Sequence, residues 1–480
     1  MRDRLSVLIV GAECAPFAKV GGLADVIGAL PVELNRQGVD ARVMIPLHKK
    51  IKEKYFEKMQ TLAKFYVNLG WRKQYAGILT MQFRGVTFYF VDSEYYFGTE
   101  IYRGGEAEGE QYSFFSRAVL ESLSLIDFIP DVIHCNDWHT GIIPMLIKTQ
   151  YRGRPQGGIK TLYTIHNLAY QGKFSQGFIQ DMLGIGPEYY NSEFIEAYGC
   201  ANFLKSALVF ADLLNTVSPT YASEIMTQYF GEGMDGVLCK RSADLSGILN
   251  GMDTELYDPS RDKALYANYT YLSLENRRLC KADLMNALNL GTKLDTPIIG
   301  VVTRMTSQKG LDLIVRVMDE IMSENVAMVV VGSGERQYED FFMQSAYKYC
   351  GRMSVKLGYD DELARKVYAG SDFFLMPSKF EPCGISQMIA MRYGSLPIVR
   401  ETGGLADTVH PYNQYTGEGN GFSFRNFNAH DMLNVIRLAL KCYTNAEIMD
   451  GLISSAMSRD SSFAVSASEY MGLYTSLAER

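Results

Sequence analysis

Short apolar runs alternate with amphipathic helical stretches along most of this sequence, and the alternation occurs in both halves of the chain. The runs of the first half cover residues 5–10, 41–45, 87–91, 132–135, 161–165 and 213–217. Those of the second half cover residues 298–302, 327–331, 354–357, 373–376 and 396–399. Strands that alternate with helices form parallel sheets covered on both faces. The pattern therefore predicts an α/β protein with two doubly wound, Rossmann-like domains.

One segment interrupts the alternation and marks the expected domain boundary. Residues 246–262 read SGILNGMDTELYDPSRD, and their Gly, Asn, Asp and Pro residues break the periodicity. A chain of 480 residues is also too long for one ordinary hydrophobic core. We expect an N-terminal domain over 1–248 and a C-terminal domain over 249–460. Residues 461–480 have a helical pattern with no following strand, so we expect a helix that packs back on the N-terminal domain.

Charge and cysteine usage argue against several classes of protein. The formal net charge is −7, and 47% apolar with 21% charged residues is the composition of a globular protein. The charges are interspersed without a basic stripe, which argues against nucleic acid or an anionic membrane surface as a partner. No stretch reaches the roughly 20 apolar residues that span a bilayer. The eight cysteines form no CxxC pair, so we expect reduced thiols in a cytoplasmic protein.

The sequence GGLAD occurs twice, at 21–25 and at 403–407, each time after a strand region and at the start of a predicted helix. Paired glycines let a backbone approach a ligand, and a helix N-terminus presents N–H groups and a positive dipole end to an anion. In open α/β sheets such loops lie at the carboxyl ends of strands, where ligands bind. The repeat predicts that each domain brings one such loop to a shared phosphate-bearing ligand.

Two cations follow the first strand of the second half. Arg304 and Lys309 lie in TRMTSQKGLDLI, before a helix expected to begin near Gly310. Cations at a strand end suit a developing diphosphate leaving group, and solvated surface charges are the alternative interpretation. The sequence contains no Asp-x-Asp and no HExxH, which metal sites often use. We therefore expect no metal, with the leaving-group charge met by these residues and by backbone amides.

The loop after residues 327–331 reads VGSGER. A dinucleotide-binding fingerprint would require a third glycine where this chain has Gln337. An oxidoreductase is therefore disfavoured, and we expect the loop to shape one wall of a ligand-binding cleft.

Polar residues follow strands of the first half as well. His166 opens HNLAYQG, and the run of Asp137, Trp138 and His139 follows another expected strand. Each histidine has two interpretations, a structural cap or a side chain that fixes sugar hydroxyls. The strand-end positions and the neighbouring indole favour a sugar pocket. In the second half Glu381, in SKFEPCGISQ, is the carboxylate placed to hold a ribose or sugar hydroxyl.

Seven motifs in a fixed order carry a family resemblance. They are KVGGLADVIGALP, HCNDWHTG, TIHNLAYQG, GILNGMDTELYDP, TRMTSQKGLDL, SKFEPCGISQM and TGGLADTV. The ordered set closely resembles bacterial glycogen synthases and plant starch synthases, from residue 5 to about residue 475. This resemblance implies the GT-B glycosyltransferase fold, in which two domains face each other across a deep cleft. It also implies ADP-glucose as donor, an α-1,4-glucan such as glycogen as acceptor, retention of the α configuration, and no metal or other cofactor.

The resemblance and the strand-end positions together select the expected site. The catalytic residues are Arg304, Lys309, His166, Asp137 and Glu381. The substrate-binding residues are Lys19, Gly22, Asp25, His139, Asn167, Tyr359, Cys383, Gly384, Thr402, Gly403 and Gly404. By resemblance, Lys19 and Gly22 belong to a donor-binding loop, Arg304 and Lys309 hold the diphosphate, and Tyr359 stacks on the adenine.

The sequence departs from the family pattern at two positions. Ile389 stands where related retaining transferases carry a second Glu, and Val20 stands where many relatives have Thr. The resemblance assigns no nucleophilic carboxylate, so we favour front-face substitution in which the departing diphosphate accepts the proton of the acceptor hydroxyl. Another GT-B transferase, a glucan phosphorylase with pyridoxal phosphate and a noncatalytic glucan-binding protein are the alternatives.

Overall fold

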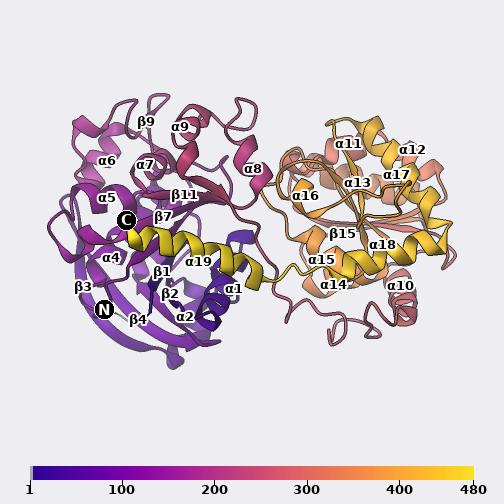
Figure 1. Ribbon diagram of the computed structural model, residues 1–480, viewed down its shortest axis with the longest axis horizontal. Coiled ribbons are helices and arrows are strands. Elements are labelled where there is room, and N and C mark those ends of the chain that lie inside the picture. The colour runs from indigo at the N-terminus through magenta and orange to yellow at the C-terminus, as the bar shows by residue number, and fades with distance from the viewer. Residues whose placement is uncertain (1–3) are drawn as a thin grey trace. The chain divides into compact units, whose positions relative to one another are not determined.

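The computed structural model describes residues 4–480, and the chain divides into two compact units (Figure 1). The first unit comprises the chain up to Gly251 together with Phe463–Arg480, and the second comprises Met252–Ser462. The chain therefore passes between the units twice. Each unit has its own open sheet.

Among residues 4–480, nine strands form the main sheet of the first unit, in the order β12-β11-β7-β6-β1-β2-β5-β4-β3. All neighbouring pairs are parallel except those made by β4, which runs antiparallel to β3 and β5. The bounds are β1 Ser6–Val10, β2 Asp40–Pro46, β3 Gln60–Leu69, β4 Arg72–Phe83, β5 Val86–Asp92, β6 Val132–Asn136, β7 Lys160–Ile165, β11 Leu213–Thr216 and β12 Leu245–Gly247. A small antiparallel sheet consists of β8 Lys173–Phe174, β9 Glu196–Ala197 and β10 Cys200–Asn202.

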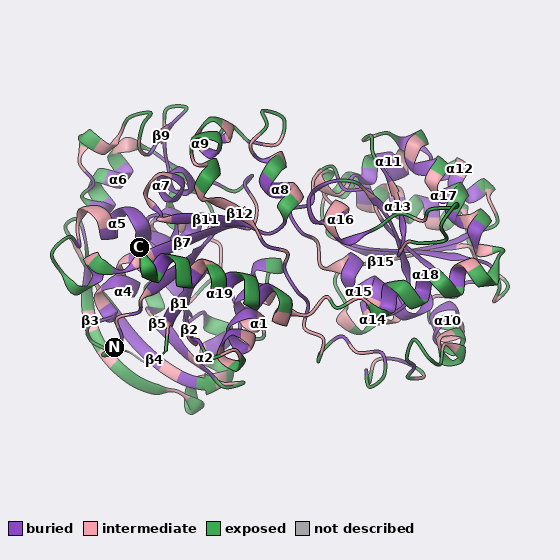
Figure 2. Cartoon of the chain, in the orientation of Figure 1, coloured by how far each residue is buried: buried purple, intermediate pink, exposed green. Residues whose placement is uncertain are grey.

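Helices cover both faces of the main sheet, and the strand at its centre shows why. In β1, Val7 and Ile9 pack with α1 and α19 on one face, while Leu8 and Val10 pack with α4, α5 and α7 on the other. A strand buried on both faces reads as a continuous apolar run, and Figure 2 shows these strands as buried. The helices are α1 Gly22–Arg36, α2 Lys49–Tyr55, α3 Glu94–Phe97, α4 Gly105–Ser122, α5 Ile143–Thr149, α6 Gln176–Leu183, α7 Phe203–Phe210, α8 Pro219–Glu224, α9 Asp235–Lys240 and α19 Phe463–Glu479.

The C-terminal helix α19, yellow in Figure 1, is tied to the first unit by buried polar contacts. The Tyr470 hydroxyl donates to Asn215 Oδ1 at 2.8 Å, and the Tyr474 hydroxyl lies 2.8 Å from His134 Nδ1. Burial lowers the pKa of His134 to about 3, so its ring is neutral at physiological pH. Buried polar groups that all have partners fix one packing arrangement.

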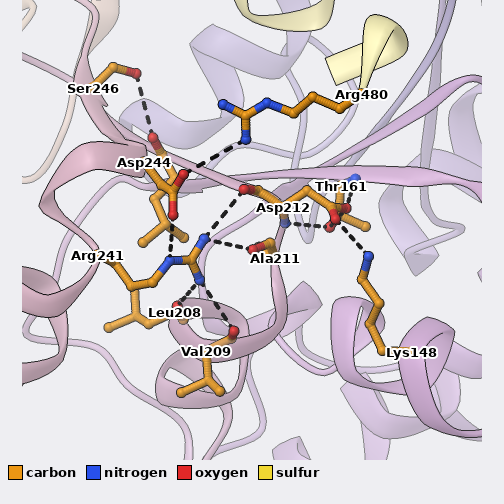
Figure 3. A network of polar contacts seen from close by, with 11 residues as sticks. Lys148, Thr161, Leu208, Val209, Ala211, Asp212, Arg241, Asp244, Ser246 and Arg480 are labelled. Carbon is orange, nitrogen blue, oxygen red and sulfur yellow. Dashed lines mark hydrogen bonds and ion pairs between the residues drawn. The ribbon is translucent and has the colours of Figure 1, made fainter. Parts of the chain in front are cut away.

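A second polar network lies at the amino ends of β7 and β11 (Figure 3). The Arg241 guanidinium donates to the carbonyl oxygens of Leu208 at 2.7 Å and Ala211 at 2.9 Å, which belong to the carboxyl end of α7. It also pairs with Asp244, whose other partner is Arg480 at 3.8 Å. Because carbonyls at a helix end lack intrahelical partners, the guanidinium acts as a structural cap.

Among the described residues, six parallel strands form the sheet of the second unit, in the order β15-β14-β13-β16-β17-β18. This is the strand order of a Rossmann fold. The strands are β13 Ile298–Val302, β14 Ala327–Gly332, β15 Met353–Leu357, β16 Phe373–Met376, β17 Leu396–Arg400 and β18 Phe422–Phe424. The helices are α10 Glu275–Ala287, α11 Leu311–Arg316, α12 Met318–Ser323, α13 Arg336–Lys348, α14 Asp361–Gly370, α15 Ser386–Arg392, α16 Gly403–Thr408, α17 Ala429–Tyr443 and α18 Ala446–Ser458.

The predicted α/β class is confirmed in both units, and each apolar run named above coincides with a strand to within one residue at its ends. The sequence analysis did not identify the hairpin β3–β4, the short strands β12 and β18, or the small sheet. The first unit is therefore a mixed sheet with an antiparallel edge. No helix within residues 4–480 is both long and apolar enough to cross a membrane.

Candidate active site

In both units several of the expected site residues lie at the point where the strand order reverses. β1 lies between β2 and β6 in the first sheet, and β13 lies between β14 and β16 in the second. The loops that leave the carboxyl ends of such central strands diverge, and ligands bind in the crevice between them. The loops after β1, β6, β13 and β16 therefore form the candidate site of their respective units.

The loop between β1 and α1 contains Lys19, Gly22 and Asp25. Lys19 Nζ forms a 2.7 Å ion pair with Asp25 Oδ1, and the two side chains are 41% and 25% exposed. Gly22 is the first residue of α1. The second GGLAD, at 403–407, likewise begins α16, so both repeats lie at helix N-termini.

A buried carboxylate, Glu13, holds the backbone of the same loop. It accepts hydrogen bonds from the N–H groups of Val20 and Gly21, the latter at 3.1 Å. Burial raises the pKa of Glu13, against the effect of these two hydrogen bonds. Two of the amides that precede α1 are therefore occupied by a carboxylate of the same unit.

Asp137 lies directly after β6 in a strained backbone conformation, with φ 55° and ψ 177°. Residues other than glycine adopt it at a cost of about 1–3 kcal/mol, and such strain gathers at functional sites. The carboxylate accepts hydrogen bonds from the N–H groups of His166 at 2.8 Å and Asn167 at 3.4 Å, which follow β7. Burial nevertheless raises the pKa of Asp137 to about 7. Asp137 is thus both a cap of the β7 loop and a buried acid that titrates near neutral pH.

The two histidines expected in the candidate site of this unit, His139 and His166, are neutral. His166 Nε2 lies 2.8 Å from Asn136 Oδ1, and burial lowers the pKa of His166 to about 3. His139 Nε2 lies 3.7 Å from Glu108 Oε1, and burial lowers the pKa of His139 as well. The contact with Glu108 is therefore not an ion pair at neutral pH. A neutral imidazole offers one donor and one acceptor, which suits sugar hydroxyls.

Three further residues of this cluster have no counterpart in the sequence analysis, namely Glu13, Glu108 and Tyr102. The Tyr102 ring lies 5.0 Å from the His139 ring, between their centroids. Burial and the charges of Glu13 and Asp137 raise the pKa of Tyr102. These residues belong to no short motif, and the only signal in the sequence is Glu13 closely following an apolar strand.

In the second unit, Arg304 and Lys309 follow β13 as expected, but their surroundings differ. Lys309 Nζ forms a 2.6 Å ion pair with Glu381 Oε2, and the two side chains are 15% and 9% exposed. The Arg304 side chain is exposed and forms no hydrogen bond or ion pair with the other residues of 4–480. Because Glu381 follows β16, the Lys309–Glu381 pair bridges the two strand ends at which the sheet order reverses.

The glycine loop before α16 packs against the segment that carries Glu381. Gly403 has φ +45°, and a Cβ there would lie 2.0 Å from the Glu381 carbonyl oxygen. The Gly404 N–H donates to the carbonyl oxygens of Glu381 and Pro382, both at 3.2 Å. These glycines are therefore required for close approach of two protein segments. Of the other expected residues here, Cys383 and Thr402 are buried and Gly384 is in a left-handed conformation.

Tyr359 lies in the loop after β15 and is 70% exposed. Its hydroxyl donates to Asp361 Oδ1 at 3.0 Å, which holds one end of the ring while a face is open to solvent. An exposed ring fixed at its hydroxyl suits stacking on a base.

Contacts thus join Asp137 with His166 and Asn167 in the first unit, and Glu381 with Lys309 and the glycine loop in the second. Within residues 4–480, no group of three or more histidine, cysteine or acidic side chains is arranged to hold a metal ion. The eight cysteines are free thiols in the described part of the chain.

Comparison with known proteins gives a consistent result over the whole chain. Residues 6–240 match the family model described as the starch synthase catalytic domain, and residues 288–451 match that of glycosyl transferases group 1. The chain is 50% identical to the glycogen synthase of Geobacillus thermodenitrificans (strain NG80-2) over 477 residues, covering 99% of this chain and 98% of that protein. It is 47% identical to the glycogen synthase of Clostridium novyi (strain NT), covering 99% and 100%. Among solved structures, it is similar to the catalytic domain of starch synthase IV from Arabidopsis thaliana bound to ADP and acarbose, with a TM-score of 0.91, 31% identity and coverage of 99% and 100%.

Proposed function

The chain belongs to the glycogen synthase and starch synthase family, and on this premise we propose that it transfers glucosyl groups from ADP-glucose to the non-reducing end of an α-1,4-glucan, with retention of configuration and release of ADP. The observation that carries the proposal is the identity of about one half to glycogen synthases over essentially the whole length of both chains. The similar starch synthase structure, bound to ADP and acarbose, supports the choice of nucleotide and of a glucan-like acceptor.

The second unit provides the donor side in this proposal. Arg304 and Lys309 meet the diphosphate at the carboxyl end of β13, and the Tyr359 ring stacks on the adenine. Base stacking on an aromatic side chain contributes about 1–3 kcal/mol. The Arg304 guanidinium pairs with no other residue of 4–480 and is available to a phosphate. The sugar and phosphate side is lined by two segments, which contain Cys383 with Gly384 and Thr402 with Gly403 and Gly404.

The first unit provides the glucan side and one wall of the sugar pocket. Asp137, His139, His166 and Asn167 lie at neighbouring strand ends and offer hydroxyl-binding groups; the first two are buried and the other two are half-buried. We include the loop of Lys19, Gly22 and Asp25 among the substrate-binding residues of this unit.

We assign the chemistry to front-face substitution. Charge grows on the departing diphosphate as the glycosidic bond breaks, and preorganised cations stabilise this charge. A diphosphate oxygen then takes the proton of the acceptor hydroxyl, which attacks the same face of the sugar. Ile389 stands where a second carboxylate would be required for a paired-Glu site, so the scheme uses none.

Release of ADP from ADP-glucose, measured with and without glycogen, tests the proposal. We expect ADP release only with glycogen present, together with elongation of the glucan. UDP-glucose in a parallel assay measures donor choice. ADP release at the same rate with and without glycogen would contradict the proposed function. Formation of glucose 1-phosphate from glycogen and phosphate, by a protein with a pyridoxal absorbance band, would indicate a phosphorylase and would also contradict it. Binding of glycogen without any turnover would indicate a noncatalytic glucan-binding protein.

A further inference from the structure

The candidate site of each unit contains a lysine that is already paired with a carboxylate of the same unit. Lys19 pairs with Asp25 at 2.7 Å and Lys309 with Glu381 at 2.6 Å. Glu13 has a similar role for backbone groups, because its carboxylate accepts hydrogen bonds from the N–H groups of Val20 and Gly21. A phosphate that reaches these groups therefore meets a protein anion already in place.

The Lys309–Glu381 pair is the more enclosed of the two ion pairs. Its side chains are 15% and 9% exposed, against 41% and 25% for Lys19 and Asp25. Glu381 Oε2 also accepts a hydrogen bond from the Ser378 hydroxyl at 3.1 Å, whereas Oε1 accepts none from the residues of 4–480. A largely buried ammonium without a counterion is costly. Glu381 therefore serves as the counterion of Lys309 and holds it in place while no ligand is bound.

We propose that Glu381 is a surrogate anion for Lys309, which the donor's diphosphate displaces, so that Lys309 exchanges a carboxylate for a phosphate when the donor binds. This inference rests on the function proposed above. An ammonium has three donors and no fixed plane, so it changes partner by rotation of a flexible side chain. The released carboxylate, with Oε1 already unpaired, becomes an acceptor for a sugar hydroxyl. One residue thereby serves the resting enzyme and the bound donor in turn.

The two possible roles of Glu381 predict opposite changes in nucleotide affinity when its charge is removed. A carboxylate that only contacts the ligand loses affinity when it is neutralised. A carboxylate that competes with the ligand for Lys309 weakens nucleotide binding, so its neutralisation strengthens binding. The sign of the change therefore separates the two roles.

The experiment is titration calorimetry of ADP with the full-length wild-type chain and with Glu381→Gln. Gln retains the size of Glu and an acceptor for the Ser378 hydroxyl, but it carries no charge. We expect Glu381→Gln to bind ADP about three- to tenfold more tightly, the range of a partly enclosed ion pair. Unchanged or weaker binding overturns the proposal. Glu381→Asp, whose carboxylate is shorter by one methylene and therefore pairs more weakly with Lys309, is expected to change affinity in the same direction by a smaller factor and serves if the Gln variant does not fold.

Two variants control the interpretation. Glu418→Gln makes the same charge change in the same unit outside the loops of the candidate site, because the exposed Glu418 accepts the Thr416 hydroxyl at 3.2 Å and has no ion-pair partner within 4–480. Its ADP affinity is expected to change less than about twofold. In a Lys309→Met background the gain from Glu381→Gln is expected to vanish, since the effect acts through Lys309. A gain that persists there overturns the exchange.

The wild-type titration also distinguishes a failure of the exchange at Lys309 from a failure of the proposed function. A wild-type chain that does not bind ADP contradicts the proposed function. A wild-type chain that binds ADP, with no gain in Glu381→Gln, contradicts the exchange alone.

Discussion

Replacement of Asp137 by Asn is expected to stabilise the first unit at alkaline pH while it abolishes turnover. Asn has the same shape, and its Oδ1 still accepts the N–H groups of His166 and Asn167. Asn also tolerates the positive φ of this position better than most residues. The substitution therefore removes only the ionisable carboxyl group, and with it the negative charge of a side chain that is 8% exposed.

The sign of the effect follows from the direction of the pKa shift. The pKa of Asp137 is raised from 3.8 to about 7 by burial, so between these values the folded chain holds a proton that the unfolded chain has released. The free energy of unfolding consequently falls as the pH rises from about 4 to about 7, and the Asn variant escapes this loss. At about 1.4 kcal/mol per pKa unit, the shift sets an upper bound of about 4 kcal/mol at pH 8. The difference in the free energy of unfolding between the variant and the wild type therefore decreases toward zero near pH 4.

Tryptophan fluorescence provides the assay. Both tryptophans of the chain, Trp71 and Trp138, lie in the first unit, so their emission in a urea titration follows the unfolding of that unit. We expect the stability gain of Asp137→Asn to be larger at pH 8 than at pH 5 by at least about 1 kcal/mol. Asp127→Asn is the matched control, since Asp127 also has positive φ, at 51°, but is exposed. An equal gain at both pH values, or the same pH dependence in the control, would refute the reasoning.

Three further predictions test the donor side. Arg304→Ala and Lys309→Ala are each expected to lower kcat at least about 100-fold, because they stabilise charge that grows in the transition state. A raised KM with unchanged kcat in steady-state kinetics would remove either residue from the leaving-group role. Tyr359→Ala is expected to raise the KM for ADP-glucose about five- to a hundredfold with a smaller effect on kcat, since stacking is present in both ground and transition states. Unchanged donor KM would place Tyr359 outside the site. Turnover is expected to persist in excess EDTA, and a loss that Mg²⁺ or Mn²⁺ restores would contradict a leaving group neutralised by side chains alone.

The central strands could be predicted from the sequence because they are buried on both faces. β13 was expected at residues 298–302 and spans Ile298–Val302, all of it buried. The edge hairpin β3–β4 could not be predicted in the same way. Its strands are partly exposed and pair antiparallel, so their apolar residues are interrupted by polar ones. Strand order is a property of pairing between distant segments, and no local pattern encodes it.

The candidate site shows the same difference between residues that a local pattern indicates and residues that come from distant segments. Residues in motifs, such as Asp137 and Lys309, lie at the strand ends where the sequence placed them. The partners of those residues were not predictable, because they come from elsewhere in the chain. Glu108 reaches His139 from α4, and Glu13 holds a loop several residues downstream. Motifs thus indicate the candidate site residues but not the partners that hold them.

Structural contacts and proposed catalytic roles are combined in the same side chains. Asp137 caps the loop after β7 and also carries a raised pKa in a strained backbone. Glu381 neutralises Lys309, and its carboxylate also accepts a hydrogen bond from the Ser378 hydroxyl. An alanine at either position would remove both roles and would not tell them apart. Asn at 137 and Gln at 381 keep the hydrogen bonds and delete only the charge, so changes in pH dependence and ADP affinity then report the chemistry of the site.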